Sequence, residues 1–319
     1  MTRALGMAAT SVGPALRNVA RGVGAVDSGV GSSSRRTICA LARSGSTKHQ
    51  ALQHLHQLCG GFLSPTSRRR FLQGAGMLGM MSSAPLRAQA AGVSEAEEVL
   101  KNVQWPEQFP FSKEDFARYD ESPDTSFYDA PRFVTHIDDP AIRALTKYYS
   151  SALPPSNTPG VAVLDMCSSW ISHYPKGYKQ ERIVGLGLNE AELQRNEVLT
   201  EHVVQDLNNN PTLPFADNSF DVITNVVSVD YLTKPMEIFK EMHRVLKPGG
   251  LAAMSFSNRC FFTKAISIWT STGDIDHVMI VGSYFHYSGG FEPPQALDIS
   301  PNPGRSDPMY VVYSRKLTA

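Results

Sequence analysis

Two short motifs constrain the fold of this chain more than any other feature. The first, LPFADNSFD, occupies residues 213–221, and the second, RVLKPGG, occupies residues 244–250. Between them, residues 220–229 form a nearly continuous apolar run rich in β-branched side chains. Such a run is typical of a strand that is buried on both faces of a parallel sheet.

A helix is predicted directly after this strand. Pro235 suits the first turn of a helix, and residues 247–250 (KPGG) supply a cation, a helix-stopping proline and two glycines at its end. Apolar residues recur between them at intervals of three and four, which predicts one apolar stripe. The stripe comprises Ile238, Phe239, Met242, Val245 and Leu246. Residues 251–256 are apolar again, so strand, helix and strand form a right-handed βαβ unit.

Two further strands are predicted upstream of the motifs. Residues 161–165 (VAVLD) and 183–188 (IVGLGL) are short apolar runs, and Asn189 is well placed to cap a helix after the second. Open α/β sheets bind ligands beyond the carboxyl ends of their strands. The polar residues near these ends are therefore expected to converge on one crevice. They are Asp165, Asn189, Asp206 and Asn225.

With these motifs, residues 203–258 resemble the second half of a class I S-adenosylmethionine-dependent methyltransferase of the small-molecule (type 11) group. The resemblance implies an α/β fold with a Rossmann-like, doubly wound, seven-stranded sheet whose last strand is antiparallel. It also implies S-adenosylmethionine as the cofactor. In this family the carboxylate at the position of Asp206 receives the adenine amino group, and Leu207 would donate its backbone N–H.

Two positions depart from the family pattern. The loop after the first strand (residues 165–170, DMCSSW) has no glycine, whereas the family has a glycine-rich loop there. Gly187 occupies the place of the ribose-binding carboxylate, so Asn189 or Glu190 is the candidate substitute, although capping alone would explain Asn189. The predicted cofactor-binding residues are Asp165, Cys167, Ser168, Asn189, Asp206, Leu207 and Asn225.

Residues 91–155 are predicted to form a helical and aromatic lid segment ahead of a methyltransferase-like domain at residues 156–319. The lid includes a helix over residues 139–149, and residues 284–287 and 310–314 are predicted as the strands of a closing hairpin. Candidate lid contacts are Tyr128, Arg132, Phe133 and His136, and packing against the sheet would explain them equally well. The substrate-pocket candidates are Tyr128, Asp230, Tyr231 and His286. No single catalytic residue is predicted, because none of these has a diagnostic partner in the sequence.

The N-terminal region predicts a location. Before Glu95 the chain has eleven Lys and Arg residues and one acidic residue, Asp27. Residues 1–66 are predicted to be a disordered transit peptide, and residues 67–90 a twin-arginine signal, which begins SRRRFL and ends AQA. This arrangement resembles the targeting of thylakoid-lumen proteins to plant and algal chloroplasts. A basic arm that binds nucleic acid is the weaker alternative.

The remaining chain is acidic, since residues 95–319 hold nineteen Lys and Arg residues against twenty-nine Asp and Glu residues. A formal charge of −10 argues against nucleic acid or an anionic membrane surface as a partner. No segment is apolar over the length of a membrane span. Cys167 and Cys260 show no metal-ligand spacing, so no metal is predicted, and a disulfide between them is the less favoured alternative.

These observations favour methyl transfer from S-adenosylmethionine to a small-molecule acceptor in the thylakoid lumen. The alternative is a catalytically silent methyltransferase-like domain that binds or assembles with a lumenal protein partner. The altered first loop and Gly187 favour the alternative, whereas Asp206 and the LPFADNSFD motif favour the enzyme. A dinucleotide-dependent dehydrogenase is excluded because the loop after the first predicted strand lacks the glycine fingerprint and because the downstream motifs match methyltransferases.

Overall fold

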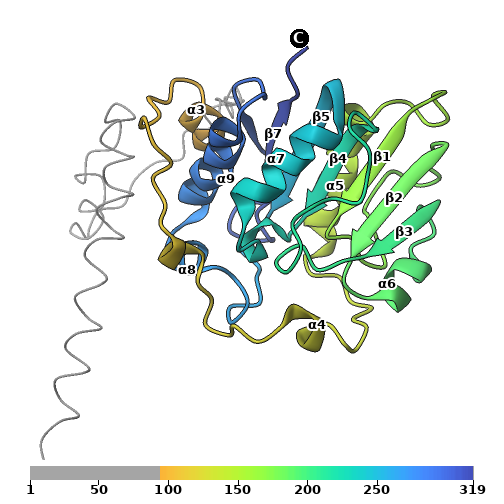
Figure 1. The fold of residues 1–319 in the computed structure, drawn as a ribbon, viewed down its shortest axis with the longest axis horizontal. Helices are drawn as coiled ribbons and strands as arrows, with labels where there is room; N and C mark the ends of the chain where they lie inside the picture. Colours follow the sequence, from red (N-terminus) through yellow and green to blue (C-terminus); the bar gives the residue numbers. More distant parts are fainter. Residues whose placement is uncertain (1–93, 319) are drawn as a thin grey trace, which may run out of the picture. The chain divides into compact units, whose positions relative to one another are not determined.

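Seven strands form one mixed sheet in a computed structural model that describes residues 94–318 (Figure 1). The strands are β1 (Ala162–Met166), β2 (Arg182–Gly187), β3 (Glu201–Val204), β4 (Phe220–Val226), β5 (Leu246–Phe256), β6 (Gln295–Asp298) and β7 (Tyr310–Arg315). The α-helices are α3 (Glu95–Val99), α4 (Asp124–Phe127), α5 (Asp139–Ala152), α6 (Glu190–Arg195), α7 (Pro235–Val245), α8 (Ser267–Thr270) and α9 (Asp274–Ser288). Short 3₁₀ helices are η2 (Lys113–Phe116) and η3 (Val229–Tyr231).

The strand order is β3-β2-β1-β4-β5-β7-β6. The first five strands in sequence pair in parallel, and β7 runs antiparallel to both β5 and β6. The order reverses between β1 and β4, whose carboxyl ends therefore flank the switch point at which such sheets bind ligands. This topology confirms the predicted doubly wound, seven-stranded sheet with an antiparallel last strand.

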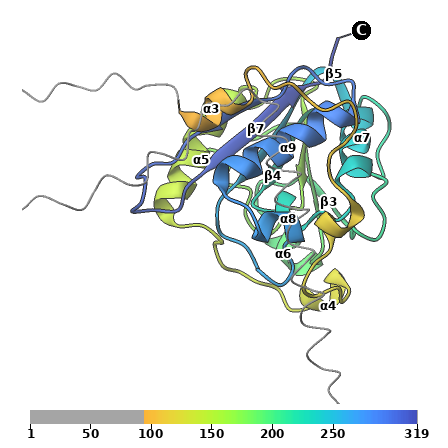
Figure 2. The same ribbon diagram turned by 90° about the vertical axis from the view of Figure 1, so that its left-hand side faces the viewer.

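Helices cover both faces of the sheet, so each strand alternates between two hydrophobic cores. In β1, Leu164 packs in the core under α7 and α9, whereas Val163 packs in the core under α5. In β4, Ile223 packs in the first of these cores and Val222 in the second. Figure 2 shows α5 on one side of the sheet and α7 on the other. This burial on both faces explains why the strands are continuous apolar runs.

The two sequence motifs touch each other in the fold. Arg244, in the last turn of α7, donates hydrogen bonds to the backbone carbonyls of Leu213 (2.9 Å) and Phe215 (2.8 Å) and pairs with Asp217 at 2.7 Å. Glu241 accepts from Arg244 and from the Leu213 backbone N–H. The co-occurrence of the two motifs therefore has a physical cause: one helix end holds the preceding loop in place.

A second ion pair fixes the start of the central strands. Lys247 lies 2.7 Å from the Asp221 carboxylate and also donates to the Gly160 carbonyl. The same Asp221 oxygen accepts the backbone N–H of Ala162 at the beginning of β1. Thus the second motif also positions the strand that leads into the ligand-binding edge.

Most predicted elements are confirmed, but the closing hairpin is not where the sequence placed it. Residues 284–287 lie in helix α9 rather than in a strand. The helix is buried on nearly all sides, so it lacks the polar face that distinguishes a surface helix from a buried strand. The hairpin partner of β7 is instead β6, which lies between the two predicted strands.

The predicted transit peptide and twin-arginine signal lie outside the described residues. Across residues 94–318, no helix is both long enough and apolar enough to cross a membrane. Cys167 and Cys260 are free thiols.

The contacts of Arg244 with residues 213–217 and Glu241, here called the Arg244 clamp, predict an effect on stability. Replacing Arg244 with Ala removes charge-assisted bonds to two carbonyls and two carboxylates, and we expect a loss of about 2 kcal/mol in the free energy of unfolding. Arg244→Lys should recover less than half of this loss, because an ammonium cannot bridge the four acceptors as a planar guanidinium does. Urea unfolding measures both variants. The exposed Arg143→Ala is the control, and an equal effect of Arg143 and Arg244 would refute the clamp.

Candidate functional site

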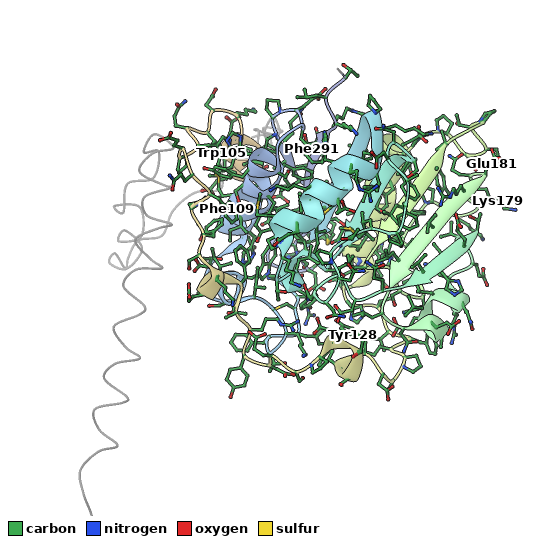
Figure 3. The ribbon with its side chains drawn as sticks, in the orientation of Figure 1. Trp105, Phe109, Tyr128, Lys179, Glu181 and Phe291 are labelled. Atoms are coloured by element: carbon green, nitrogen blue, oxygen red, sulfur yellow. The ribbon has the colours of Figure 1, made fainter. Side chains whose placement is uncertain are left out.

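A cavity of about 360 Å³ lies at the carboxyl ends of the parallel strands. Its floor comes from the residues that follow β1, β2, β3 and β4, and the loop after β5 closes one side. The segment from α4 to His136 covers it, and Figure 3 shows Tyr128 at this edge of the sheet. The volume lies within the range of small-ligand sites.

The structure brings together most of the residues that the sequence singled out. Among the predicted cofactor-binding residues, those that line the cavity are Asp165, Cys167, Ser168, Asn189, Asp206 and Leu207. Among the predicted substrate-pocket and lid residues, those that line it are Tyr128, Tyr231, Arg132 and His136. Sequence positions more than 100 residues apart therefore share one cavity, as expected for the switch point of an open sheet.

Asp165 anchors the glycine-free loop instead of presenting a free carboxylate. One of its oxygens accepts the hydroxyls of Ser168 (2.6 Å) and Ser172 (2.7 Å), and the other accepts the hydroxyl of Thr224 on β4 (3.0 Å). Its side chain is buried, and burial raises the pKa of the carboxyl to about 6, although the three hydroxyls oppose the shift. The network joins β1, β4 and the loop in one rigid unit.

The same loop blocks the family position for a ribose carboxylate. The Ser168 backbone N–H donates to the Leu186 carbonyl of β2, which presses the loop against the strand end. A Cβ atom on Gly187 would lie 2.2 Å from the Ser168 carbonyl oxygen. Any side chain at Gly187 would therefore displace the loop, so a carboxylate cannot occupy this position while the loop keeps its conformation.

Glu192, in the first turn of α6, supplies a carboxylate next to this blocked position. It lines the cavity and is buried, whereas Glu190 is exposed and lies outside the lining. Its oxygens accept the Ser169 hydroxyl (2.6 Å) and the Arg132 backbone N–H (2.6 Å). Glu192 was not among the predicted residues, because it differs from Glu190 only in its burial, which the sequence does not show.

Asn189 has the capping role that was the alternative explanation for it. Its side-chain oxygen accepts the Glu192 backbone N–H (3.1 Å), and its amide group donates to the backbone carbonyls of Tyr128 (2.9 Å) and Asp129 (3.2 Å). Asn189 thus holds both α6 and the lid in position. From this position Asn189 also lines the cavity.

Asp206 and Asn208 organise the turn after β3. One Asp206 oxygen accepts the backbone N–H groups of Asn208 (2.9 Å) and Asn209 (3.2 Å). The Asn208 amide donates to Asp124 of α4 (2.9 Å) and to the Tyr231 carbonyl (2.8 Å). This turn therefore ties the lid to the connection after β4, a role that the sequence alone did not reveal.

Two predicted site residues lie behind the cavity wall instead of in it. Asn225 is fully buried, and its amide donates to the Met166 carbonyl (3.1 Å), so it fastens β4 to β1 rather than contacting a ligand. Asp230 is also buried, and desolvation raises the pKa of its carboxyl to about 8. Neither residue lines the cavity, because both are almost completely buried in the packed interior.

His286, which the sequence suggested as a substrate-pocket residue, also lies away from the cavity. It lies in α9, where its ring stacks on Trp105 with the ring centroids 5.0 Å apart. It does not line the cavity, and Figure 3 shows Trp105 far from Tyr128, on the opposite side of the fold. The prediction failed because it assumed a strand at this position, whereas the helix directs the side chain elsewhere.

His173, from the loop after β1, lines the cavity and is buried. Its Nδ1 is buried without a hydrogen-bond partner among the described residues, and burial lowers its pKa to about 4. The imidazole is therefore neutral at pH 7. His173, Cys167 and Val227 all line the cavity with positive φ angles of 58°, 58° and 43°. Such strain in non-glycine residues persists only where the surrounding structure imposes it.

The Asp165 carboxyl predicts a pH-dependent stability. The pKa of the Asp165 carboxyl is about 6 in the folded state, above its ordinary value of 3.8. The contribution of this carboxyl to the stability of the fold is therefore complete below pH 3.8 and is lost as the pH rises through 6. Asp165→Asn should therefore gain about 2 kcal/mol relative to wild type between pH 4.5 and pH 7.5. Urea unfolding at both pH values measures this gain. The exposed Asp129→Asn should show no such change, and a constant difference between Asp165→Asn and wild type would contradict the prediction.

Comparison with known proteins gives this cavity a family context. Residues 167–254 match the family described as "Methyltransferase domain". The chain is 36% identical over 101 residues to a demethylmenaquinone methyltransferase of Bacillus cereus, in a match that covers 29% of the chain and 43% of the relative. It is 32% identical over 92 residues to the biotin biosynthesis bifunctional protein BioHC of Teredinibacter turnerae, covering 28% of the chain and 16% of that protein. The chain thus spans less than half the length of these relatives.

Among solved structures, the chain is similar to an S-adenosylmethionine-dependent methyltransferase from Mesorhizobium loti. The sequence identity is 16% and the TM-score is 0.38, and the match covers 54% of this chain and 98% of that one. The family match begins at Cys167 in the first loop and ends at Met254 in β5, so it includes the cavity residues that follow β2, β3 and β4. Residues 167–254 of this chain therefore match a methyltransferase domain.

Proposed function

We propose that the chain binds S-adenosylmethionine in this cavity and transfers its methyl group to a small-molecule acceptor. The observation that carries the proposal is the convergence of the first loop, the β2 end and the Asp206 turn on one cavity within the matched domain. The bound sulfonium supplies an activated methyl group. The protein then mainly has to hold an acceptor in line with that group.

The turn after β3 suits the adenine. One Asp206 oxygen is engaged by its own turn, whereas the other accepts no hydrogen bond from residues 94–318 and is free to accept one from the adenine amino group. Leu207 lines the cavity beside it. These are the positions that the family resemblance assigns to adenine recognition, and the cavity contains both.

Glu192 suits the ribose hydroxyls in place of the absent residue at Gly187. A carboxylate accepts up to about four hydrogen bonds, and Glu192 uses two of these for Ser169 and Arg132. Because the Ser168 carbonyl closes the usual position, a longer side chain from the next helix is the geometric way to reach the same place. The site therefore fits the cofactor through a rearranged set of residues.

His173 suits the proton that an acceptor hydroxyl would lose. When the oxygen forms a bond to the methyl carbon, the bond from that carbon to sulfur breaks and the hydroxyl proton needs an acceptor. A neutral imidazole in the cavity wall can take it directly or through one water.

The cofactor proposal predicts selective losses of affinity. Glu192→Gln and Asp206→Ala should each weaken S-adenosylhomocysteine binding about tenfold or more, since each removes a charge-assisted hydrogen bond. Glu190→Gln, on the same helix but outside the cavity, should change the affinity less than about twofold. Isothermal titration calorimetry on the folded chain measures all three. If wild type binds neither S-adenosylmethionine nor its product, the silent-domain alternative replaces the enzyme.

We also propose, from residues 1–90, that the protein is delivered to the thylakoid lumen. The support is the basic, acid-poor leader followed by SRRRFL and AQA. Replacing Arg68, Arg69 and Arg70 with Lys should stop arrival in the lumen in an import assay with isolated chloroplasts. Arg35→Lys with Arg36→Lys is the matched control and should be imported normally. Lumenal arrival of the triple variant would contradict this route.

A further inference from the structure

The cavity contains one arginine whose charge is not compensated. Arg132 lines the cavity from the lid, and its guanidinium donates to the Phe127 carbonyl (2.9 Å). Its Nε is buried without a hydrogen-bond partner among the described residues. A buried donor without an acceptor is costly, so this geometry indicates that a ligand supplies the acceptor.

The other two Lys and Arg residues that line the cavity, Lys264 and Arg259, already have acidic partners. Arg118 and Lys264 both face Asp124, at 2.7 Å and 3.4 Å, and Arg259 pairs with Asp307 at 2.8 Å. By contrast, no carboxylate of residues 94–318 lies within ion-pair distance of the Arg132 guanidinium. Glu192 meets the Arg132 backbone N–H and not its side chain. The positive charge of Arg132 is therefore available to an anion in the cavity.

Aromatic rings hold this guanidinium in a fixed orientation. It lies 4.3 Å from the ring centroid of Phe127, 5.2 Å from that of Phe261 and 5.8 Å from that of Tyr128. Trp170 and Tyr231 add further aromatic surface to the cavity lining. Flat apolar walls with one oriented guanidinium suit a planar or apolar molecule that carries a carboxylate.

We propose that the methyl acceptor is an organic acid with an aromatic or apolar body, and that Arg132 binds its carboxylate. The proposal rests on the proposed methyl transfer and names the substrate class of the same site. Arg132 is thereby a specificity-determining residue at the lid. The amino-acid end of the cofactor is the other source of a carboxylate, and the experiment separates the two.

The probes are 4-hydroxybenzoate and its neutral isostere 4-hydroxybenzamide. Each has a planar ring and a hydroxyl, and only the first has a carboxylate. Ligand-observed NMR titration of the full chain, with saturating S-adenosylhomocysteine, should show at least tenfold tighter binding of the acid. In Arg132→Met the acid should bind no better than the amide. Arg182→Met is the matched control, because Arg182 also lies over an aromatic ring, Phe220, but both residues are outside the cavity lining.

Each other outcome overturns the proposal. The proposal fails if wild type binds the acid and the amide equally well. It also fails if Arg132→Met leaves the affinity for the acid unchanged. If Arg132→Met instead weakens S-adenosylhomocysteine tenfold and leaves 5′-methylthioadenosine unaffected, Arg132 binds the carboxylate of the cofactor and not that of the acceptor.

Two further measurements keep the test decisive. If Arg132→Met does not fold, Arg132→Lys replaces it: it retains the charge but loses the planar donor set, and the preference for the acid should fall at least threefold. If wild type binds no S-adenosylhomocysteine, the proposed function fails, whereas the comparison of acid and amide in its absence still tests Arg132.

Discussion

The ligand-binding edge of this protein depends on the buried carboxylate of Asp165. Three hydroxyls, from Ser168, Ser172 and Thr224, converge on it and bind the loop after β1 to the neighbouring strand. Asn196 extends the network by donating to Ser172 and to the Ser169 carbonyl, which attaches the end of α6. A fully satisfied polar network of this kind gives the loop a single conformation. It does so without the glycines that the family uses at this position.

The position of this loop redistributes the roles around the cavity. Since the Ser168 carbonyl excludes a side chain at Gly187, the carboxylate that lines the cavity on this side comes from Glu192. The Glu192 carboxylate also accepts the backbone N–H of Arg132, so the floor and the lid are joined at this point. The altered motif, which by itself favoured a silent domain, is thus part of a coherent alternative arrangement of polar groups.

Local patterns in the sequence were enough to predict most of the fold. Burial on both faces makes β1, β2 and β4 continuous apolar runs, and α7 shows an apolar stripe between a proline and the KPGG turn. The same reasoning failed for α9, because a helix buried all round has no polar face. It failed again for β6, a strand of four residues whose pairing with β7 is a long-range contact.

For the site, the sequence determined which strand ends meet, since parallel strands place their carboxyl ends at one edge. It therefore identified Asp165, Asn189 and Asp206 as neighbours. Only the tertiary structure decided that Glu192 and not Glu190 faces the cavity, that Asn225 and Asp230 lie behind its wall, and that Arg132 has no acidic partner. The reason is physical: burial and charge pairing depend on side chains that come together from distant parts of the chain, whereas periodicity and turn signals act over a few residues.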